Sequence, residues 1–352
     1  MTRVAEVVDA VVGGDTHSEF HQLEIATPVG APVASVTVEN TREGFADAIC
    51  WIGRHAPGPR LIVGLEGTRS YGVGLARALR AAGFTVVEVE QPSRKDRRGK
   101  GKSDPIDAHH AVLSTLAMDA AKLPTPRADG DREALRILLI GHEAITETKT
   151  AHINALRALL TTGDEDDRQL ARGSFTVGRL QTIARRRGRA GDSRENAVRR
   201  AEARRLAAAL LDARRELRQR RGQIDELVSL LAPGMTGQRN VGPISAGRLL
   251  LTFSHPGRFR HEAAFASITG AAPVEASSGK TGTRHRLNYG GDRQANRALH
   301  DIALNRMIRC PRTRAYVERR RSEGKTDREI RRCLKRYIAR QQFRFMTAAM
   351  TP

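Results

Sequence analysis

Four carboxylates lie where they could hold metal ions together. Asp15 closes a β-branched run, Glu66 closes a second apolar run, and Asp104 and Asp107 open a helical segment. The i, i+3 spacing of the last two puts both side chains on one face of a helix. Carboxylate oxygens suit Mg²⁺, and two such ions roughly 3.5–4 Å apart promote phosphodiester cleavage by activating a nucleophile and stabilising the leaving oxygen. Each acid alone is more often a turn or cap residue, so the hypothesis depends on the combination.

A strongly basic segment directly precedes Asp104. Six of the ten residues 93–102 are cations: Arg94, Lys95, Arg97, Arg98, Lys100 and Lys102. Beside a metal site, such a segment is expected to hold the phosphate backbone of a nucleic acid. The alternative is a solvated loop with no partner.

The elements that must position these acids follow from the apolar patterning of the first 120 residues. Runs at 4–12, 20–26, 32–39, 61–66 and 84–90 predict strands. Helices are expected at 40–54 (with Asn40 as N-cap), at 70–82 and from Asp104 onward. The resulting order, βββ-α-β-α-β-α, is that of the ribonuclease H-like fold. Strands one and four are neighbours in that fold, so the four acids are expected to converge.

The middle and end of the chain are predicted to be mainly helical. After a helix at 131–160 and an arginine cluster at 185–189, apolar residues recur at 3,4 spacing over 203–231. This spacing favours a coiled-coil hairpin that dimerises, the alternative being a helix packed within its own subunit. Residues 240–246 resemble the turn of a helix-hairpin-helix motif, and 312–344 form an arginine-dense helical tail.

Composition points to a nucleic acid and excludes several other classes. The 352 residues carry 60 Lys and Arg against 39 Asp and Glu, a formal net charge of +21, and only 4% are aromatic. The charge favours an anionic polymer, and the few aromatics disfavour modules that stack bases. Cys50, Cys310 and Cys333 have no disulfide or zinc-site spacing. No apolar run is long enough for a membrane span and Glu6 and Asp9 disfavour a signal peptide, so a cytoplasmic protein is expected.

Several motifs together resemble a known family. Near the start are Gly14-Asp15, the Gly64-Leu65-Glu66 strand end and Lys102-Ser103-Asp104-Pro105-Ile106-Asp107-Ala108. Farther on are 258–273, Ser278-Gly279 and 291–299. In this order they are similar to the DEDD transposases of the IS110/IS1111 insertion sequences, the group that includes the Piv-type DNA invertases. The likeness spans nearly the whole chain, the arginine-rich middle being undiagnostic. Ser18 and Asn240 depart from it, where the family often has lysine and glycine.

The resemblance implies an architecture of α/β plus α type. It comprises a RuvC/ribonuclease H-like catalytic domain at 1–124, a helical coiled-coil dimerisation region at 125–232 and a mainly helical transposase domain at 233–352. The quartet Asp15, Glu66, Asp104 and Asp107 would bind Mg²⁺.

The resemblance also implies a nucleophile and partners. Ser278, with Ser277 as its close competitor, would attack DNA and form a transient phosphoserine link. Lys280, Arg284, Arg293 and Arg297 would contact nucleic acid. A structured guide RNA encoded by the element, DNA at the element ends and target, and a homo-oligomer (a dimer, or a tetramer in the synaptic complex) are the implied partners. The setting would be a prokaryotic nucleoid.

Three alternatives remain open at this point. The chain could invert a host DNA segment as a Piv-type invertase. It could be a RuvC-like junction nuclease that uses the carboxylates alone, in which case Ser278 is dispensable. It could also be a non-catalytic nucleic-acid-binding protein, although such a protein has no use for acids beside a phosphate.

Overall fold

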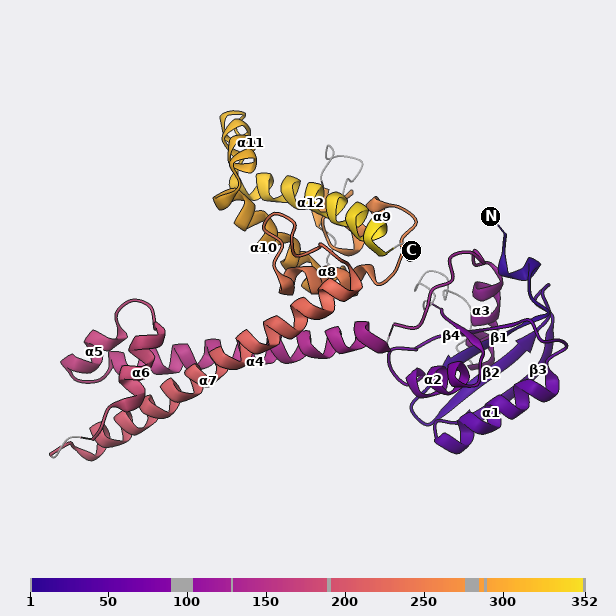
Figure 1. Ribbon diagram of the computed structural model, residues 1–352, viewed down its shortest axis with the longest axis horizontal. Coiled ribbons are helices and arrows are strands. Elements are labelled where there is room, and N and C mark those ends of the chain that lie inside the picture. Colours follow the sequence, from indigo (N-terminus) through magenta and orange to yellow (C-terminus); the bar gives the residue numbers. More distant parts are fainter. Residues whose placement is uncertain are drawn as a thin grey trace, which may run out of the picture. The chain divides into compact units, whose positions relative to one another are not determined.

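The computed structural model describes residues 2–89, 104–127, 129–188, 191–275, 285–287 and 290–350 (Figure 1). They form two compact units, each assembled from separate stretches of the chain. The first unit comprises Met1–Glu133, Thr252–Asp292 and Arg336–Pro352. The second comprises Ala134–Leu251 and Arg293–Lys335.

A five-stranded sheet forms the beginning of the first unit. Its strands are β1 (Ala10–Thr16), β2 (Phe20–Ala26), β3 (Pro32–Glu39), β4 (Leu61–Leu65) and β5 (Thr85–Glu88). They lie in the order β3-β2-β1-β4-β5. Strand β2 is antiparallel to β1 and β3, whereas β4 is parallel to β1 and β5. The three parallel strands therefore end at the same edge of the sheet.

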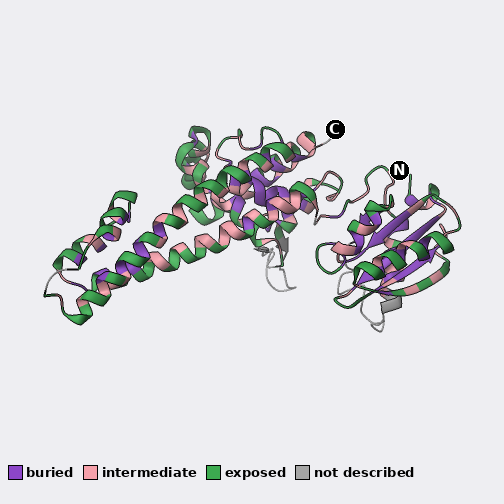
Figure 2. Ribbon diagram, turned by 60° about the horizontal axis from the view of Figure 1, so that its bottom comes forward, coloured by how far each residue is buried: buried purple, intermediate pink, exposed green. Residues whose placement is uncertain are grey.

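Helices cover both faces of this sheet (Figures 1 and 2). On one face, α1 (Arg42–His55) and α2 (Val73–Ala81) pack against alternate strand residues such as Val12 and Val63. On the other, α3 (Asp104–Leu116) and the 3-10 helix η1 (Val4–Glu6) pack against Val11 and Ile62. Because strand side chains alternate between faces, each strand position is assigned to the α1–α2 face or to the α3 face.

The order of strands and helices agrees with the prediction from sequence, but two boundaries were wrong. The run from Val4 is a 3-10 turn and not a strand: Glu6 accepts a hydrogen bond from the Arg3 N–H at 3.2 Å, and Val4 is buried beside α3. Strand β1 therefore begins at Ala10 and continues through Asp15 to Thr16. The N-cap of α1 is Thr41, whose hydroxyl accepts from the Gly44 N–H, and not Asn40.

The second unit is built on two long helices, α4 (Gly130–Thr161) and α7 (Arg194–Leu231). Two short helices, α5 (Glu165–Ala171) and α6 (Val177–Arg185), connect them. Leu206 and Leu210 of the predicted 3,4 pattern are buried against Leu156, Leu160 and Leu180 of this same chain. Part of the apolar pattern is thus satisfied within one subunit.

A buried arginine near the start of α7 connects this helix to the segments on either side of α5 and α6. Arg200 of α7 is almost fully buried and donates to Asp164 at 2.6 Å and to Asp192 at 2.5 Å. Two carboxylates from different segments compensate one guanidinium, which supplies the hydrogen bonds that a buried charge requires.

The remaining elements are mostly helices. They are α8 (Pro243–Phe253), α9 (Glu262–Ile268), α10 (Arg293–Arg309), α11 (Pro311–Ser322) and α12 (Asp327–Met350), with a two-stranded sheet of β6 (Pro273–Glu275) and β7 (His285–Leu287). In the first unit, aromatic rings of Phe253, Phe259, Phe265 and Phe343 pack with centroids 5.4–6.5 Å apart. In the part of the chain that the structure describes, no helix is both long and apolar enough to cross a bilayer.

The backbone conformation at Asn240 explains why asparagine can stand where the resembled family often has glycine. Its φ is 62°, in the left-handed region where glycine is the usual residue. Asparagine is among the few other residues that adopt this conformation readily. The turn before α8 can therefore form without glycine at this position.

Candidate active site

Asp15 and Glu66 lie next to each other at the ends of two parallel strands. Strands β1 and β4 pair as far as Gly14 and Leu65, and the Glu66 N–H then donates to the Gly14 carbonyl at 2.9 Å. Thr16 Oγ1 donates to the Glu66 carbonyl at 2.9 Å, which ties the two strand ends together. Both acidic side chains are buried, with exposed fractions of 10% for Asp15 and 2% for Glu66.

Strand alternation assigns both acids to the face that α3 covers. Asp15 follows Gly13 and Val11 at alternate positions of β1, and Glu66 follows Gly64 and Ile62 on β4. Val11 and Ile62 pack with α3, so the two acids, each four positions farther along, share that face. The convergence that the element order predicted for these two acids agrees with this register.

Two glycines let α3 approach the sheet closely. A Cβ at Gly13 would lie 2.4 Å from the Ala108 carbonyl oxygen, and a Cβ at Gly64 would lie 1.8 Å from Thr115 Oγ1. Both distances are too short for any side chain, so the helix packs directly on the strand backbone. The contact at Ala108 brings the N-terminal half of α3 to β1, the strand that carries Asp15, and the contact at Thr115 brings the C-terminal half to β4. Asp107 lies in the N-terminal half of α3 and is half-buried.

Three histidines accompany these carboxylates. His17 Nε2 lies 3.0 Å from Asp15 Oδ2, and His110 Nδ1 lies 3.9 Å from Glu66 Oε1. His109 Nδ1 lies 2.6 Å from Oε1 of Glu24, a β2 residue that pairs with Gly13. The sequence analysis did not identify these contacts. The i, i+3 spacing of Asp107 and His110 was the available signal, since it puts both on one helix face.

The donor set suits a hard divalent cation. Asp15, Glu66 and Asp107 supply carboxylate oxygens, the ligands that Mg²⁺ prefers. Asp104 is the first residue of α3, and its side chain lies outside the described part of the structure. Among the side chains that are described, no three acids, histidines or cysteines lie close enough to hold a metal ion. The predicted quartet is therefore visible here only in part, while its oxygen chemistry fits Mg²⁺.

A third buried acid, Glu88, ends the neighbouring strand β5 but is held differently. Its carboxylate accepts from Arg127 Nε at 2.7 Å and from the Arg127 N–H at 3.1 Å. Burial raises the pKa of Glu88, and the hydrogen bonds and charge of Arg127 lower it by more, so the pKa lies below its usual range. Glu88 shares its face with Val86, which packs in the α1–α2 core, and so it faces away from α3.

Most of the predicted nucleic-acid-binding residues lie outside the described residues. This holds for Arg94, Lys95, Arg97, Arg98, Lys100, Lys102, Lys280 and Arg284, and for the candidate nucleophiles Ser277 and Ser278. Arg293 is exposed at the start of α10. Arg297 is also exposed, and it donates to Glu143 Oε1 at 2.6 Å in the second unit.

Comparison with known proteins identifies two similar regions. Residues 12–163 match a family model described as a DEDD transposase of the IS110 type, and residues 238–318 match one described as "Transposase IS116/IS110/IS902 family". The first match contains Asp15, Glu66, Asp104 and Asp107, and the second contains Ser278.

A curated relative supports the same grouping. Over 123 residues the chain is 34% identical to an uncharacterized 43.6 kDa protein of the insertion element IS110 from Streptomyces coelicolor. The similarity covers 34% of this chain and spans 30% of the length of that relative.

Proposed function

Because the chain belongs to the IS116/IS110/IS902 family of transposases, we propose that it is a metal-dependent DNA transposase that cleaves and rejoins DNA strands. Its N-terminal domain, residues 1–124, is proposed to be RuvC-like, with the ribonuclease H-like sheet order as support. The chemistry is assigned to the α3 face of that sheet.

One observation carries the proposal: two buried acids lie at adjacent positions of two paired strands, on the face that α3 covers. Asp15 and Glu66 extend the alternating series that begin at Val11 and Ile62. A buried carboxylate is costly unless something compensates it, and buried acids that cluster at strand ends are typical of functional sites. The close contact of Ala108 with Gly13 puts the backbone of α3, and with it the chain position of Asp107, next to β1.

Asp15, Glu66, Asp104 and Asp107 would hold divalent metal, which supplies Lewis-acid stabilisation of charge on the reacting phosphate when it is bound. The protein's own contribution is to fix the oxygens. His17 contacts Oδ2 of Asp15, and His110 lies near Oε1 of Glu66. Such neighbours restrict the rotation of a carboxylate and thus its orientation toward a ligand.

The nucleophile is proposed to be Ser278. Its Oγ forms a bond to the DNA phosphorus as the bridging phosphorus–oxygen bond breaks, and the hydroxyl proton passes to the released DNA oxygen. The reverse reaction with a second DNA end restores the serine, so the phosphodiester is conserved. This step distinguishes a transposase or Piv-type invertase from a junction nuclease that uses the carboxylates alone.

Further parts of the proposal concern partners. Residues 125–232 would mediate dimerisation, and residues 233–352 would carry the nucleophile. A structured guide RNA would bring base pairing to the complex, because an arginine-rich chain with 4% aromatic residues suits backbone and shape recognition more than base stacking. DNA at the element ends and the target would be the substrate of a dimer or tetramer.

The test is to trap the covalent link. The full-length protein is incubated with Mg²⁺, DNA from both flanks of its gene and the RNA transcribed from those flanks, and is then resolved on a denaturing gel. We expect a protein–DNA adduct that Ser278→Ala abolishes and that Ser277→Ala, the matched control, retains. Cleavage without an adduct in the wild type would support the junction nuclease instead. DNA binding with no product in any metal would support a non-catalytic protein.

A further inference from the structure

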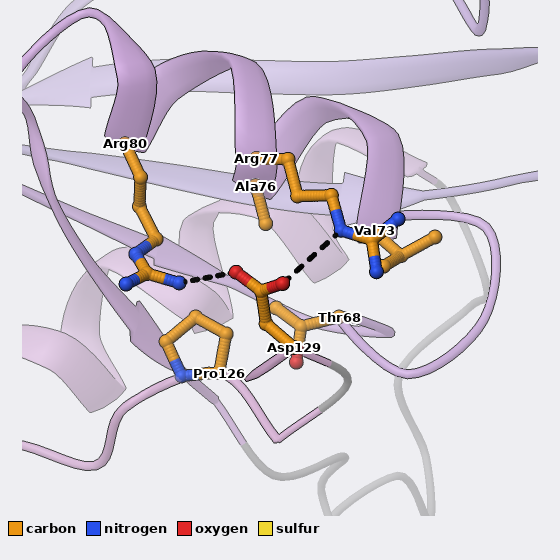
Figure 3. Close-up of a pocket in the computed structure, with 7 residues that line it drawn as sticks. All are labelled: Thr68, Val73, Ala76, Arg77, Arg80, Pro126 and Asp129. Atoms are coloured by element: carbon orange, nitrogen blue, oxygen red, sulfur yellow. Dashed lines mark hydrogen bonds and ion pairs between the residues drawn. The ribbon is translucent and has the colours of Figure 1, made fainter. Parts of the chain in front are cut away.

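A second polar cluster lies on the opposite face of the sheet, where α2 packs. Figure 3 shows Arg77 and Arg80 of α2 directed at the carboxylate of Asp129. Arg77 Nε lies 3.5 Å from Asp129 Oδ1, and Arg80 donates to Oδ2 at 2.6 Å. The i, i+3 spacing puts both guanidinium groups on one face of the helix. Each arginine contacts a different oxygen of the Asp129 carboxylate.

These three side chains line a small pocket, which extends to the segment that follows Glu66. Thr68, which is almost fully buried, lines it together with Pro126 and the two arginines (Figure 3). Thr68 comes two residues after Glu66, so their Cα atoms are at most about 7 Å apart. Ligands of open α/β sheets bind beyond the carboxyl ends of the parallel strands, which is where this segment begins.

Further arginines lie near the two that line the pocket. Asp129 is the carboxylate that lines the pocket, whereas Glu88 lies outside the lining and is paired with Arg127. A further cation, Arg132, is held by neutral oxygens: Ser254 Oγ at 2.9 Å, Thr125 Oγ1 at 2.9 Å and the Pro126 carbonyl at 3.2 Å. Burial lowers the pKa of Arg132, as do the charges of Arg127 and Arg80, which indicates that these cations lie close together. Arg77, Arg80, Arg127 and Arg132 thus lie in one neighbourhood with Asp129 and Glu88.

We propose that Arg77 and Arg80 form a phosphate-binding site for the DNA backbone, in which Asp129 occupies the position of the phosphate when DNA is absent. The side chains of Arg77, Arg80 and Asp129 are 54%, 49% and 38% exposed, so the ion pair is solvated and weak enough to exchange. Guanidinium groups bind phosphate oxygens as well as carboxylates, and often in bidentate fashion. The choice of DNA as ligand rests on the proposed function.

The test measures DNA affinity and its salt dependence in EDTA, where no metal chemistry takes place. Fluorescence anisotropy of the full-length protein with a labelled 30-base-pair duplex is recorded from 50 to 200 mM KCl. Each phosphate contact contributes about 0.9 to the slope of log K against log salt. We expect Arg77→Ala/Arg80→Ala to lower this slope by about 2 and to weaken binding about 10-fold or more. Asp129→Asn should tighten binding roughly 3- to 10-fold, because the competing charge is removed.

The matched control is Arg42→Ala/Arg54→Ala, which removes two exposed arginines of α1 in the same unit. It should keep the wild-type slope. If alanine at 77 and 80 lowers the melting temperature, the Arg77→Gln/Arg80→Gln variant replaces it. A wild-type slope in a folded variant, or weaker binding by Asp129→Asn, overturns the proposal.

Two further measurements distinguish a DNA phosphate from free phosphate as the ligand, and distinguish failure of this site from failure of the proposed function. Calorimetry with inorganic phosphate should show no binding that depends on the two arginines. If it does, and the DNA slope is unchanged, the site serves small phosphates and the DNA proposal is overturned. Adduct formation with Mg²⁺ by the wild type reports the proposed function separately, so either proposal can fail alone.

Discussion

Glu66 and Glu88 are two buried glutamates at the ends of adjacent parallel strands, yet the protein treats them in opposite ways. Glu88 is held by the guanidinium and the backbone N–H of Arg127. Glu66 is more deeply buried, at 2% exposure, and His110 Nδ1 lies 3.9 Å from its Oε1. In the first arrangement, the charge of Glu88 is compensated by Arg127, which stabilises the fold. In the function proposed above, the second places the Glu66 carboxylate beside Asp15 to bind a metal ion.

The largest expected effect is on catalysis at Glu66. Glu66→Gln keeps the shape of the side chain but removes the negative charge that a metal needs, so we expect adduct formation to fall about 10²–10³-fold. The unfolding free energy should change little or rise, because an amide costs less to bury than a carboxylate. Single-turnover adduct formation and urea denaturation measure the two quantities. Retained activity would remove Glu66 from the proposed site.

The complementary change should act on stability. Glu88→Gln leaves the Arg127 guanidinium, 15% exposed, without its ionic partner, and loss of one partner from a buried pair costs about 3–5 kcal/mol. We expect a loss of about 3 kcal/mol of unfolding free energy in urea, with activity per folded molecule unchanged at a temperature where the variant is folded. If Glu88→Gln instead lost activity without losing stability, the division of roles between the two glutamates would be reversed.

Sequence could not separate these two glutamates. Both come at the end of an apolar run, and the partner that distinguishes Glu88 lies 39 residues farther on, in a segment with no regular pattern. Periodicity reports which face of an element is apolar, but it does not report which distant side chain reaches a strand end.

Where local patterning decides the structure, sequence succeeded. The alternating runs at 20–26 and 32–39 are β2 and β3 with the same boundaries, and the expected helix at 131–160 is α4 to within one residue at each end. It failed at Val4, where a β-branched run is buried against α3 as a 3-10 turn. It also missed the histidines beside the acids, because those contacts depend on how α3 crosses the sheet.

The cationic surroundings of Glu88 extend to His255, which gives a pH test. Burial lowers the pKa of His255 to about 4, with the charges of Arg132, Arg258 and Arg127 acting in the same direction. The unfolded chain has the higher pKa, near 6.5, so it binds more protons between these values. Stability from the neutral imidazole is therefore present above pH 6.5 and is lost as the pH falls toward 4.

We expect this contribution to fall by about 2 kcal/mol between pH 7 and pH 5. His255→Asn, which can still accept a hydrogen bond from Ser254, should lose less stability than the wild type over this interval, as measured by urea denaturation at both pH values. Equal losses in the two proteins would mean that His255 titrates normally in the folded state.

The smallest expected effect concerns His17, which we propose orients Asp15. His17 Nε2 lies 3.0 Å from Asp15 Oδ2, and His17 is one-third exposed, so its replacement should cost little stability. Loss of a partner that orients a metal-binding carboxylate typically costs 10–100-fold, and the exposure of His17 favours the lower limit. We therefore expect His17→Gln to slow adduct formation about 10-fold.

His109→Gln is the matched control, because His109 makes an even shorter contact, 2.6 Å, with Glu24, an acid outside the proposed quartet. If orientation of the metal-binding acids is what matters, His17→Gln slows the reaction and His109→Gln does not. Equal effects of the two changes would mean that the histidines support the packing of the α3 face as a whole. The contrast between Glu66 and Glu88 would then reflect position in the sheet alone, since histidine contacts would no longer mark the acids that do chemistry.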